Sequence, residues 1–353
     1  MNEKISRRVA LIFGGCGCEH DVSVLGAINV ESALKEAGIK SVPILIKRGG
    51  GWFASADPEA SAVTLTNESA ELFSVFPTRL DGKAGFISRG GFFEVDVALP
   101  LLHGDCGEDG RIQGLLETVG IPFIGCDTTC GALSSDKAYT KLIAKSIGIP
   151  TVSGISLSPG DSLDTAICTA ESELGYPIFV KPTRLGSSIG ASAAGCRDEL
   201  RRALDTATAI GRGYVLAEKY ISGARELECA FFECYGKQYF TNIGEIRCEG
   251  GFYDFNTKYS ESSTAHLTAS ASLPQEIRDT VREYAKRIVH ALGCRHLSRI
   301  DFFLADGVIY FNEINTMPGM TRSSMFPRLV EGEGISLSEF LSDLVESTAR
   351  APE

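Results

Sequence analysis

Short apolar runs typical of buried β-strands alternate along the chain with longer segments of helical periodicity. The runs predict strands at residues 9–13, 41–46, 95–102, 122–124, 176–181 and 215–221, and another that begins at 225. The periodic segments predict helices from about 21 to 37 (capped by Asp21 or Ser23), at 111–119, from about 134 to 146 (capped by Ser134 or Ser135), at 274–292 and at 336–348. Residues 49–94 are predicted to be irregular, and 244–267 to form a long polar loop of the kind that closes over an active site.

Residues 298–321 are the most distinctive segment, because two β-rich runs are joined there by Ala-Asp-Gly, a hairpin signal. Arg299, Asp301, Glu313 and Asn315 interrupt an otherwise apolar sequence. Residues two apart share a face of a strand, so Arg299 faces the same way as Asp301, and Glu313 the same way as Asn315. Burial of an unpaired charge is costly, so these side chains need partners or a metal. The alternative is an ordinary amphipathic hairpin with an exposed charged face.

The two carboxylates of this hairpin share a face only if its loop has an odd number of residues. A three-residue loop with Gly307 in the left-handed conformation meets that condition. Asp301, Glu313 and the amide of Asn315 would then offer only oxygen ligands on rigid strands. Such a set suits Mg²⁺ and suits Zn²⁺ poorly.

Two polar, Gly-rich loops follow predicted strands, at residues 14–23 and 103–110. Ligands of open α/β sheets bind beyond the carboxyl ends of the strands. Glu19 and His103 are therefore candidate binding residues. The alternatives are a solvated glutamate and a histidine that only packs its loop.

The first of these loops departs from the dinucleotide-binding fingerprint. His20 follows Gly15 and Gly17 where the third glycine is required, and Lys47 and Arg48 end the second strand where an acidic residue is required. The sequence thus argues against a Rossmann cofactor site and a dehydrogenase-like protein.

Lys181 ends a predicted strand and precedes the flexible stretch 182–190, Pro-Thr-Arg-Leu-Gly-Ser-Ser-Ile-Gly. Backbone N–H groups and hydroxyls of such a loop can surround phosphate oxygens while the lysine supplies positive charge. A plain tight turn is the alternative. Further along, Glu218 and Glu226 flank a turn between strands, where they could bind an adenine amine and ribose hydroxyls or could be solvated edge charges.

Composition narrows the class of protein. A length of 353 residues suggests two or three domains, with a boundary near residue 130. The net charge of −11 argues against nonspecific binding to nucleic acid or anionic membranes, and no apolar run approaches the roughly 20 residues that span a bilayer. The N-terminal apolar run is too short for a secretory signal, so we expect a cytoplasmic protein.

The eleven cysteines are the least usual feature of the composition. The close pairs Cys16/Cys18 and Cys126/Cys130 lack the paired spacing of a zinc site. We expect reduced, mostly buried thiols that behave as small apolar side chains.

Several segments, in order along the chain, resemble the D-alanine–D-alanine ligase family of the ATP-grasp superfamily. They are FGGCGCEHDVS, LPLLHGDCGEDGRIQGLLE, SSDKAYTK, VKPTRLGSSIG, the YDFNTKY loop, SRIDFF, and NEINTMPGMT followed by Ser324 and Phe326-Pro327. The resemblance spans nearly the whole chain, and its collinearity is more specific than any one motif. It implies an ATP-grasp fold of mixed α/β and α+β class with an N-terminal α/β (pre-ATP-grasp) domain. Residues 1–130 would form that substrate domain, 131–215 the central ATP-grasp subdomain, and 216–353 the C-terminal one with the lid loop and the Mg²⁺ site.

The resemblance also implies roles for individual residues. The ATP-binding residues would be Lys137, Lys181, Ser187, Ser188, Glu218, Lys219, Tyr220, Ile221, Glu226, Lys258, Phe303, Asn312 and Glu313. Two Mg²⁺ ions, for which Mn²⁺ could substitute, would be held by Asp301, Asn315 and a bridging Glu313. The amino-acid substrates would meet Glu19, His103, Ser324 and an oxyanion hole of Arg299 and the Gly319 N–H, with Tyr259 in a hydrogen-bond network with Glu19 and Ser187.

The implied reaction makes D-alanyl-D-alanine for peptidoglycan precursors. ATP would convert one D-alanine to an acyl phosphate, Mg²⁺ and lysines would neutralise the transferring phosphoryl group, and the amine of a second D-alanine would attack. The oxyanion hole would stabilise the tetrahedral state, and the lid would exclude water. The resemblance further implies a homodimer with no nucleic-acid or membrane partner.

Departures from the family pattern concern the second substrate. Cys16-Gly17-Cys18, Phe255-Asn256-Thr257 and Arg322 replace the more usual residues. Tyr259 resembles the dipeptide-forming branch, not the D-lactate ester branch. Met325 resembles the D-alanine type, since similar D-serine ligases often carry arginine there. We expect D-alanine twice, with D-serine as the nearest alternative.

Two other hypotheses stay open at the level of sequence. Another ATP-grasp ligase, of glutathione-synthetase or carboxylase type, would share the lysines and the metal hairpin but not Glu19, His103 and Tyr259. A nucleotide-binding module without catalysis would have lost Arg299 or a metal carboxylate, and the chain retains them.

Overall fold

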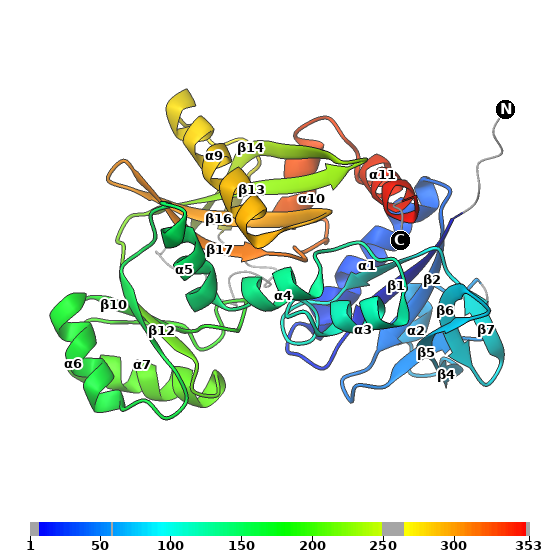
Figure 1. Ribbon diagram of the computed structural model, residues 1–353, viewed down its shortest axis with the longest axis horizontal. Coiled ribbons are helices and arrows are strands. Elements are labelled where there is room, and N and C mark those ends of the chain that lie inside the picture. The colour runs from blue at the N-terminus through cyan, green and yellow to red at the C-terminus, as the bar shows by residue number, and fades with distance from the viewer. Residues whose placement is uncertain (1–6, 58, 249–264, 351–353) are drawn as a thin grey trace.

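The computed structural model describes residues 7–57, 59–248 and 265–350, and these form lobes built on separate sheets (Figure 1). The N-terminal sheet has the order β4-β3-β2-β1-β8, with β1 parallel to both β2 and β8. Its elements, with the helices around them, are β1 (Arg8–Gly14), α1 (His20–Glu36), β2 (Lys40–Ile46), β3 (Trp52–Ser55), α2 (Ala62–Thr66), β4 (Leu72–Ser74), β8 (Val97–Leu101), α3 (Arg111–Val119) and α4 (Thr128–Ser134).

Strand β1 is apolar from Val9 onward because both of its faces are covered there. Val9, Leu11 and Phe13 pack into one hydrophobic core, while Ala10 and Ile12 pack into another. Parallel strands buried on two faces read as continuous apolar runs, which is why the sequence predicted this strand correctly. The sheet's carboxyl edge therefore lies at Gly14 and Leu101, where the two Gly-rich loops begin.

The prediction that residues 49–94 are irregular is wrong. Besides β3, α2 and β4, a small antiparallel sheet of order β5-β6-β7 occupies residues 76–94. Its strands are β5 (Phe76–Leu80), β6 (Lys83–Ser88) and β7 (Gly91–Glu94). They are short, and most of their residues are at least partly exposed, so they lack a clear apolar alternation.

The second lobe is an antiparallel sheet of order β11-β10-β12-β9, covered by two helices (Figure 1, α6 and α7). Its elements are β9 (Gly154–Leu157), α6 (Leu163–Glu173), β10 (Ile178–Pro182), β11 (Ser192–Ala194), α7 (Arg197–Ile210) and β12 (Val215–Lys219). Helix α5 (Lys137–Ser146) leads into it. One apolar core fills the space between the sheet and the two helices.

The third lobe is an antiparallel sheet of order β15-β14-β13-β16-β17. It comprises β13 (Arg225–Cys234), β14 (Lys237–Cys248), β15 (Ala265–Thr268), α9 (Gln275–Leu292), β16 (Leu297–Ala305), β17 (Val308–Asn315), α10 (Met325–Glu331) and α11 (Leu337–Ala349). Helix α9 shares a core with one face of β13, whereas α10 and α11 share a core with the other. That second core also contains α1 residues, so it joins the C-terminal helices to the N-terminal sheet. In the described part of the chain, no helix combines the length and apolarity needed to cross a membrane.

Several predicted boundaries need correction. Neither Asp21 nor Ser23 caps α1. Glu19 is the N-cap, but its side chain makes no capping hydrogen bond, and the Ser23 hydroxyl accepts from Gly14 N at 2.8 Å. Asp136 caps α5, because its carboxylate accepts from Ala138 N, so Ser134 and Ser135 do not. The predicted strand at 122–124 is a single bridge between Ala98 and Phe123. Within the predicted loop 244–267, β14 continues to Cys248 and β15 starts at Ala265, while 249–264 lie outside the described residues.

The hairpin of β16 and β17 reaches the predicted arrangement by another route. Its loop has two residues, Asp306 and Gly307, both with positive φ (50° and 77°), so the predicted three-residue loop is wrong although Gly307 is left-handed as expected. Phe302 pairs with Phe311, yet Asp301 pairs with Glu313, which makes Asn312 the extra residue of a β-bulge. The bulge supplies the odd residue that places both carboxylates opposite each other.

Candidate active site

Three adjoining cavities lie where the lobes meet. The outer cavity, of about 530 Å³, is lined by Glu218, Lys219, Tyr220, Ile221, Glu226 and Phe303 among others. The middle cavity, of about 100 Å³, is lined by Lys137, Lys181, Ser187, Ser188, Asp301, Asn312 and Glu313 among others. The inner cavity, of about 130 Å³, is lined by Glu19, His103, Arg299, Asn315, Gly319 and Ser324 among others.

The cavities are continuous, because they share side chains. Lys181, Glu226 and Phe303 line both the outer and the middle cavity. Ser187 and Glu313 line both the middle and the inner cavity. Every predicted site residue that the structure describes thus lines one connected space. Lys258 and Tyr259 lie outside the described residues, so their predicted positions are not addressed.

The charged residues of the hairpin are paired across its face. Arg299 makes a bidentate pair with Asp301, Nε to Oδ1 at 2.8 Å and Nη2 to Oδ2 at 2.7 Å, and its Nε lies 3.2 Å from the buried Glu228 carboxylate. Burial opposes the charged guanidinium, but Asp301 and Glu228 outweigh it and raise the pKa of Arg299 well above its ordinary value. Asn315 Nδ2 donates to Asp301 Oδ2 at 3.1 Å, so its carbonyl oxygen is left for another partner.

Lysines approach the hairpin from the second lobe and from α5. Lys137 Nζ lies 3.2 Å from Glu313 Oε2 and donates to Leu185 O at 2.8 Å. Lys181 Nζ lies 2.9 Å from Glu218 Oε2 and donates to Asn312 Oδ1, on the bulge, at 3.1 Å. Two lysine ammonium groups therefore line the middle cavity, each paired with a carboxylate.

Lys141 is a buried lysine that the sequence reasoning missed. Its Nζ lies 2.5 Å from Glu218 Oε1, and both side chains are about 95% buried or more. Burial lowers the pKa of Lys141 to about 8, partly offset by Glu218. Burial would raise the pKa of Glu218, yet Lys141 and Lys181 together lower it. Lys141 lies four residues after Lys137 on α5, on the same helical face, a spacing that could have revealed it.

Glu19 is held between two glycine-containing loops. The Ser187 hydroxyl donates to Glu19 Oε1 at 2.5 Å, from a loop in which Ser187 has φ of 51°. A Cβ on Gly104 would lie 2.5 Å from Glu19 Oε2, so no larger residue fits there without displacing the carboxylate. Glu19 itself is only 8% exposed. The solvated alternative for this glutamate is therefore wrong.

His103 and Glu108 line the inner cavity. His103 Nδ1 lies 3.1 Å from Met317 O, and burial lowers the pKa of this imidazole, which favours the neutral form. Glu108 accepts from Gly104 N at 3.0 Å and from Met317 N at 3.4 Å. Burial first, and then the charge of Glu19, raise the pKa of Glu108 to about 7. The sequence reasoning did not single out Glu108, although it lies within the second Gly-rich loop.

Gly319 and Ser324 close the inner cavity after the hairpin. The Ser324 hydroxyl lies 2.8 Å from Thr321 Oγ1 and accepts from Thr321 N at 3.2 Å. A Cβ on Gly319 would lie 2.8 Å from Ser324 Oγ, so the backbone approaches this hydroxyl as only glycine allows. Met325 follows, 2% exposed and lining the same cavity.

Two of the departures from the family pattern lie outside the cavities, and the third, Phe255-Asn256-Thr257, lies outside the described residues. Arg322 is exposed and its Nε contacts Asn29 Oδ1 of α1 at 3.4 Å, and it does not line the inner cavity. Cys16 and Cys18 are exposed on the first Gly-rich loop. Of the cysteines whose side chains are described, all are free and five are buried (Cys126, Cys130, Cys229, Cys234 and Cys294), so the expectation of mostly buried thiols holds for half.

Two family models together cover most of the chain. The model described as "D-ala D-ala ligase N-terminus" matches residues 8–126, and that described as "D-ala D-ala ligase C-terminus" matches 143–346. A D-alanine–D-alanine ligase from Chlorobium phaeovibrioides is 38% identical over 351 residues, covering 96% of each chain. One from Deinococcus radiodurans is 36% identical over 349 residues, covering 97% of this chain and 98% of its own.

Solved structures agree with the sequence relatives. D-alanyl-alanine synthetase A from Vibrio cholerae superposes with a TM-score of 0.84 at 32% identity, covering 99% of this chain and 100% of its own. The VanG D-Ala:D-Ser ligase from Enterococcus faecalis also reaches 0.84, at 31% identity, covering 97% and 99%. The ATP-grasp fold predicted from the resemblance is confirmed, and the chain belongs to the D-alanine–D-alanine ligase family.

Proposed function

We propose that this protein is an ATP-dependent ligase that joins two D-alanine molecules into D-alanyl-D-alanine through an acyl phosphate, releasing ADP and phosphate, for peptidoglycan precursor synthesis in the cytoplasm. The observation that carries the proposal is the connected space of three cavities. One end can take a nucleoside, the lysine-rich middle can take phosphates, and the far end offers a carboxylate, an arginine and a hydroxyl to amino acids. A simple nucleotide-binding module would have no need of the inner cavity.

The hairpin residues fit the Mg²⁺ that this chemistry requires. Asp301 and Glu313 are paired directly opposite each other, and the Asn315 carbonyl oxygen is free of Asp301, so the donors are all oxygen. We propose that these three residues hold two ions, with Glu313 as the bridge and Mn²⁺ as a substitute. The ions would neutralise charge on the transferring phosphoryl group. Lys137 and Arg299 already lie against these carboxylates, which limits the repulsion between them.

The nucleotide end of the site follows from its charges. We propose that Lys137 and Lys181 bind phosphates beneath the loop that carries Ser187 and Ser188. The pairing of Glu218 with Lys141 and Lys181 fixes its carboxylate at the entrance to the outer cavity. There Glu218, residues 219–221 and Glu226 would hold adenine and ribose.

The acyl-transfer end uses fixed donors. Glu19 would bind the ammonium of the first D-alanine, with Ser187 orienting it. Arg299, held in place by Asp301 and Glu228, and the Gly319 N–H would stabilise the tetrahedral oxyanion. Ser324 would bind the second carboxylate. The predicted roles of Lys258 and Tyr259 in the lid are part of the same proposal.

D-Serine is the alternative second substrate, since one structural relative is a D-Ala:D-Ser ligase. The buried Met325 in the inner cavity favours D-alanine, because a thioether offers little to a serine hydroxyl. Arg322 points toward Asn29, so it does not supply the missing hydrogen bond. We also propose a homodimer, on the family resemblance.

Phosphate release by the purified protein tests the proposal. With ATP, Mg²⁺ and D-alanine, we expect phosphate and ADP in equal amounts, and no release with L-alanine. D-Serine or D-lactate added to a limiting D-alanine supply should leave D-alanyl-D-alanine the main product by mass. If D-alanyl-D-serine were the main product, the second substrate would be D-serine and not D-alanine. A protein inactive with all of these substrates would contradict the proposed reaction.

A further inference from the structure

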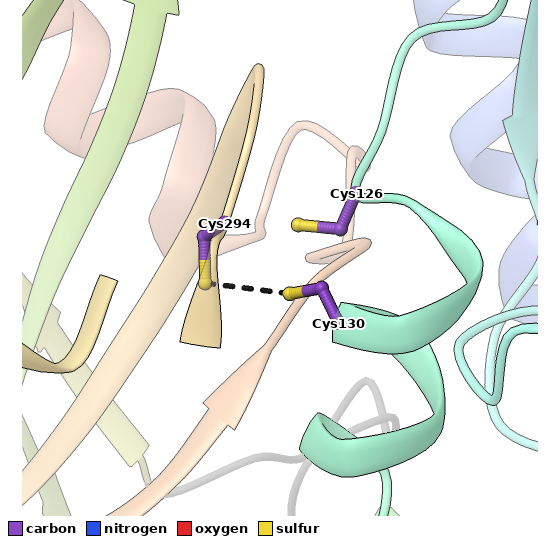
Figure 2. A group of neighbouring side chains, drawn as sticks. All are labelled: Cys126, Cys130 and Cys294. Atoms are coloured by element: carbon purple, nitrogen blue, oxygen red, sulfur yellow. Dashed lines mark hydrogen bonds between the residues drawn. The ribbon is translucent and has the colours of Figure 1, made fainter. Parts of the chain in front are cut away.

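Three cysteine side chains meet in the core, away from the proposed active site. Cys126 and Cys130 come from the start of α4 and the loop before it, and Cys294 from the turn between α9 and β16, 164 residues after Cys130 (Figure 2). The three sulfur atoms all lie within 4.8 Å of one another, with Cys130 Sγ and Cys294 Sγ 3.6 Å apart. The residues are 1%, 0% and 4% exposed. Figure 2 shows the side chains converging on a common point.

Local hydrogen bonds hold each cysteine at this point. The Asp127 carboxylate caps α4 by accepting from Cys130 N at 2.8 Å. Left-handed Gly293 ends α9, and Cys294 N then donates to Val289 O at 2.9 Å. Arg295 N donates to Cys126 Sγ at 3.4 Å. A backbone N–H directed at a sulfur is the kind of hydrogen bond that orients a thiolate ligand around a metal.

The spacing of the sulfurs matches a three-sulfur site to within small side-chain movements. With metal–sulfur bonds near 2.3 Å, three sulfurs in a trigonal plane around one ion lie about 4 Å apart. The observed separations, from 3.6 Å to at most 4.8 Å, bracket that value. Rotation of side chains whose backbone is already fixed would bring all three into contact with an ion. Plain apolar packing of cysteines is the competing explanation, and it gives no reason for three thiols to converge from two distant segments.

The donor set selects the class of ion. Within the described residues, no histidine or carboxylate joins the three sulfurs. Ser134 Oγ lies 3.6 Å from Cys130 Sγ and Arg295 O lies 3.5 Å from Cys126 Sγ, and apolar core side chains make up the rest of the surroundings. A structural zinc ion takes four ligands, and an iron–sulfur cluster takes four cysteines. Mg²⁺ and Ca²⁺ need oxygen. A soft ion that is stable with three sulfurs and no water fits best.

We propose that Cys126, Cys130 and Cys294 form a buried binding site for one soft, thiophilic ion of the Cu(I) class, in three-sulfur coordination. The ion joins the segment before α4 to the segment that leads into β16. Cys294 lies five residues before Arg299, so the link fixes the strand that carries the proposed catalytic residues. Because the ion would bind the folded protein and not the unfolded chain, binding would stabilise the folded state by mass action. The proposal does not depend on the proposed ligase reaction.

Copper retention by the full-length, reduced protein tests this site. The protein is titrated anaerobically with Cu(I) in the presence of a competing Cu(I) chelator. The number of copper ions bound per chain is then measured by elemental mass spectrometry. The sulfur-to-copper charge-transfer absorbance and the thermal unfolding temperature are followed in parallel. We expect one copper per chain and a higher unfolding temperature. Cys294→Ala should lower the affinity for Cu(I) by more than about 100-fold. Loss of a residue that only hydrogen-bonds to a metal ligand costs up to that much, and loss of a ligand should cost more.

Cys229→Ala is the matched control, because Cys229 is fully buried in the same core but outside the group. It should retain copper as the unaltered protein does. If Cys294→Ala does not fold, Cys126→Ala is measured in its place, with circular dichroism to confirm folding. The proposal would be overturned if the protein lost its copper to the chelator or retained zinc but not copper. It would also be overturned if Cys294→Ala, or Cys126→Ala in its place, retained copper as well as Cys229→Ala does. A disulfide between Cys130 and Cys294 in protein purified without reductant and unable to bind copper once reduced would overturn it too.

Discussion

Asp301 connects several side chains of the site. Its carboxylate takes both donors of Arg299 and the amide of Asn315, and it faces Glu313 across the hairpin. We predict that Asp301→Asn lowers kcat/KM by roughly three orders of magnitude or more, since it removes a metal ligand and also releases the guanidinium meant for the oxyanion. Steady-state phosphate release at saturating Mg²⁺ measures the effect.

The turn of the same hairpin supplies the control for this substitution. Asp306→Asn makes the same chemical change at an exposed position, and asparagine tolerates the left-handed conformation that Asp306 adopts. Its activity should stay within about twofold of the unaltered protein's, because substitutions at exposed positions usually have small effects. Full activity of Asp301→Asn would contradict the proposal that Asp301 is a Mg²⁺ ligand.

Glu108 should make stability depend on pH in an unusual direction. Its pKa in the folded state, about 7, is above the ordinary 4.5, so between these values the folded protein holds a proton that the unfolded chain has released. The favourable contribution is therefore present below pH 4.5 and is lost as the pH rises to 7, by up to about 3 kcal/mol. Glu108→Gln should remove this loss. Urea unfolding of both proteins at pH 4 and pH 8 measures the difference, and identical pH dependence would contradict the assignment.

At the scale of residues, sequence reasoning succeeded where chemistry and spacing coincide. Arg299 and Asp301, two apart on a strand, do share a face and form a bidentate pair. Lys141 and Glu228 escaped notice because their importance comes from partners far along the chain, Glu218 and Arg299. The four-residue spacing from Lys137 could have pointed to Lys141, but the partners themselves are fixed by tertiary packing, which no local pattern reports.

At the scale of elements, the bulge at Asn312 is the feature on which the site's geometry depends. Without the bulge, the two-residue loop would pair Asp301 with Asn312, and Glu313 would turn to the other face. Deletion of Asn312 would leave Glu313 opposite Asp301 in a regular ladder, so a folded deletion variant and Asn312→Ala should each lower phosphate release by only roughly tenfold, as loss of the one hydrogen bond to Lys181 allows.

Folding of the two variants must be compared before their activities are. Circular dichroism and thermal unfolding should show a folded protein in both. A folded deletion variant far less active than Asn312→Ala would contradict the account of the bulge as a change of register alone.

Elements with strong local signals were predicted closely, and those without them were not. Helix α3 begins and ends at the predicted residues, and α9 ends at left-handed Gly293 as expected. The strands β5 to β7 were missed, since short and partly exposed strands lack a two-residue alternation. The bulge was missed because the sequence indicates only that one extra residue is needed to bring Asp301 and Glu313 to the same face. A three-residue loop and a bulge supply that extra residue equally well.

At the scale of the whole molecule, one core joins the two ends of the chain. Phe340 of α11 is 1% exposed and packs against Phe232 and Phe326, in the same cluster as Val30 of α1. Phe340→Ala should lower the free energy of unfolding by about 3–5 kcal/mol, by lost burial and the cavity left behind. Urea unfolding measures this. Leu142→Ala, at a side chain 60% exposed, is the control and should change stability by less than about 0.5 kcal/mol.

The overall fold was predictable from collinear motifs and not from periodicity. Hydrophobic patterns indicated an α/β start, but nothing in them specified three sheets around a common cleft. Motifs from the first Gly-rich loop to Ser324 carried that information, because each motif that the structure describes contributes a side chain to the connected cavities. The long separations between them, as between Glu19 and Ser187, are set by the packing of whole lobes.

Transfer of carboxylate oxygen to phosphate tests the central claim most directly. The protein is incubated with ATP, Mg²⁺ and D-alanine labelled with ¹⁸O in both carboxyl oxygens, and the products are identified by mass. An acyl phosphate requires that each D-alanyl-D-alanine formed be accompanied by one phosphate carrying a single ¹⁸O. Dipeptide formed with unlabelled phosphate would contradict the acyl-phosphate route, and labelled phosphate without the dipeptide would contradict the second D-alanine as acceptor.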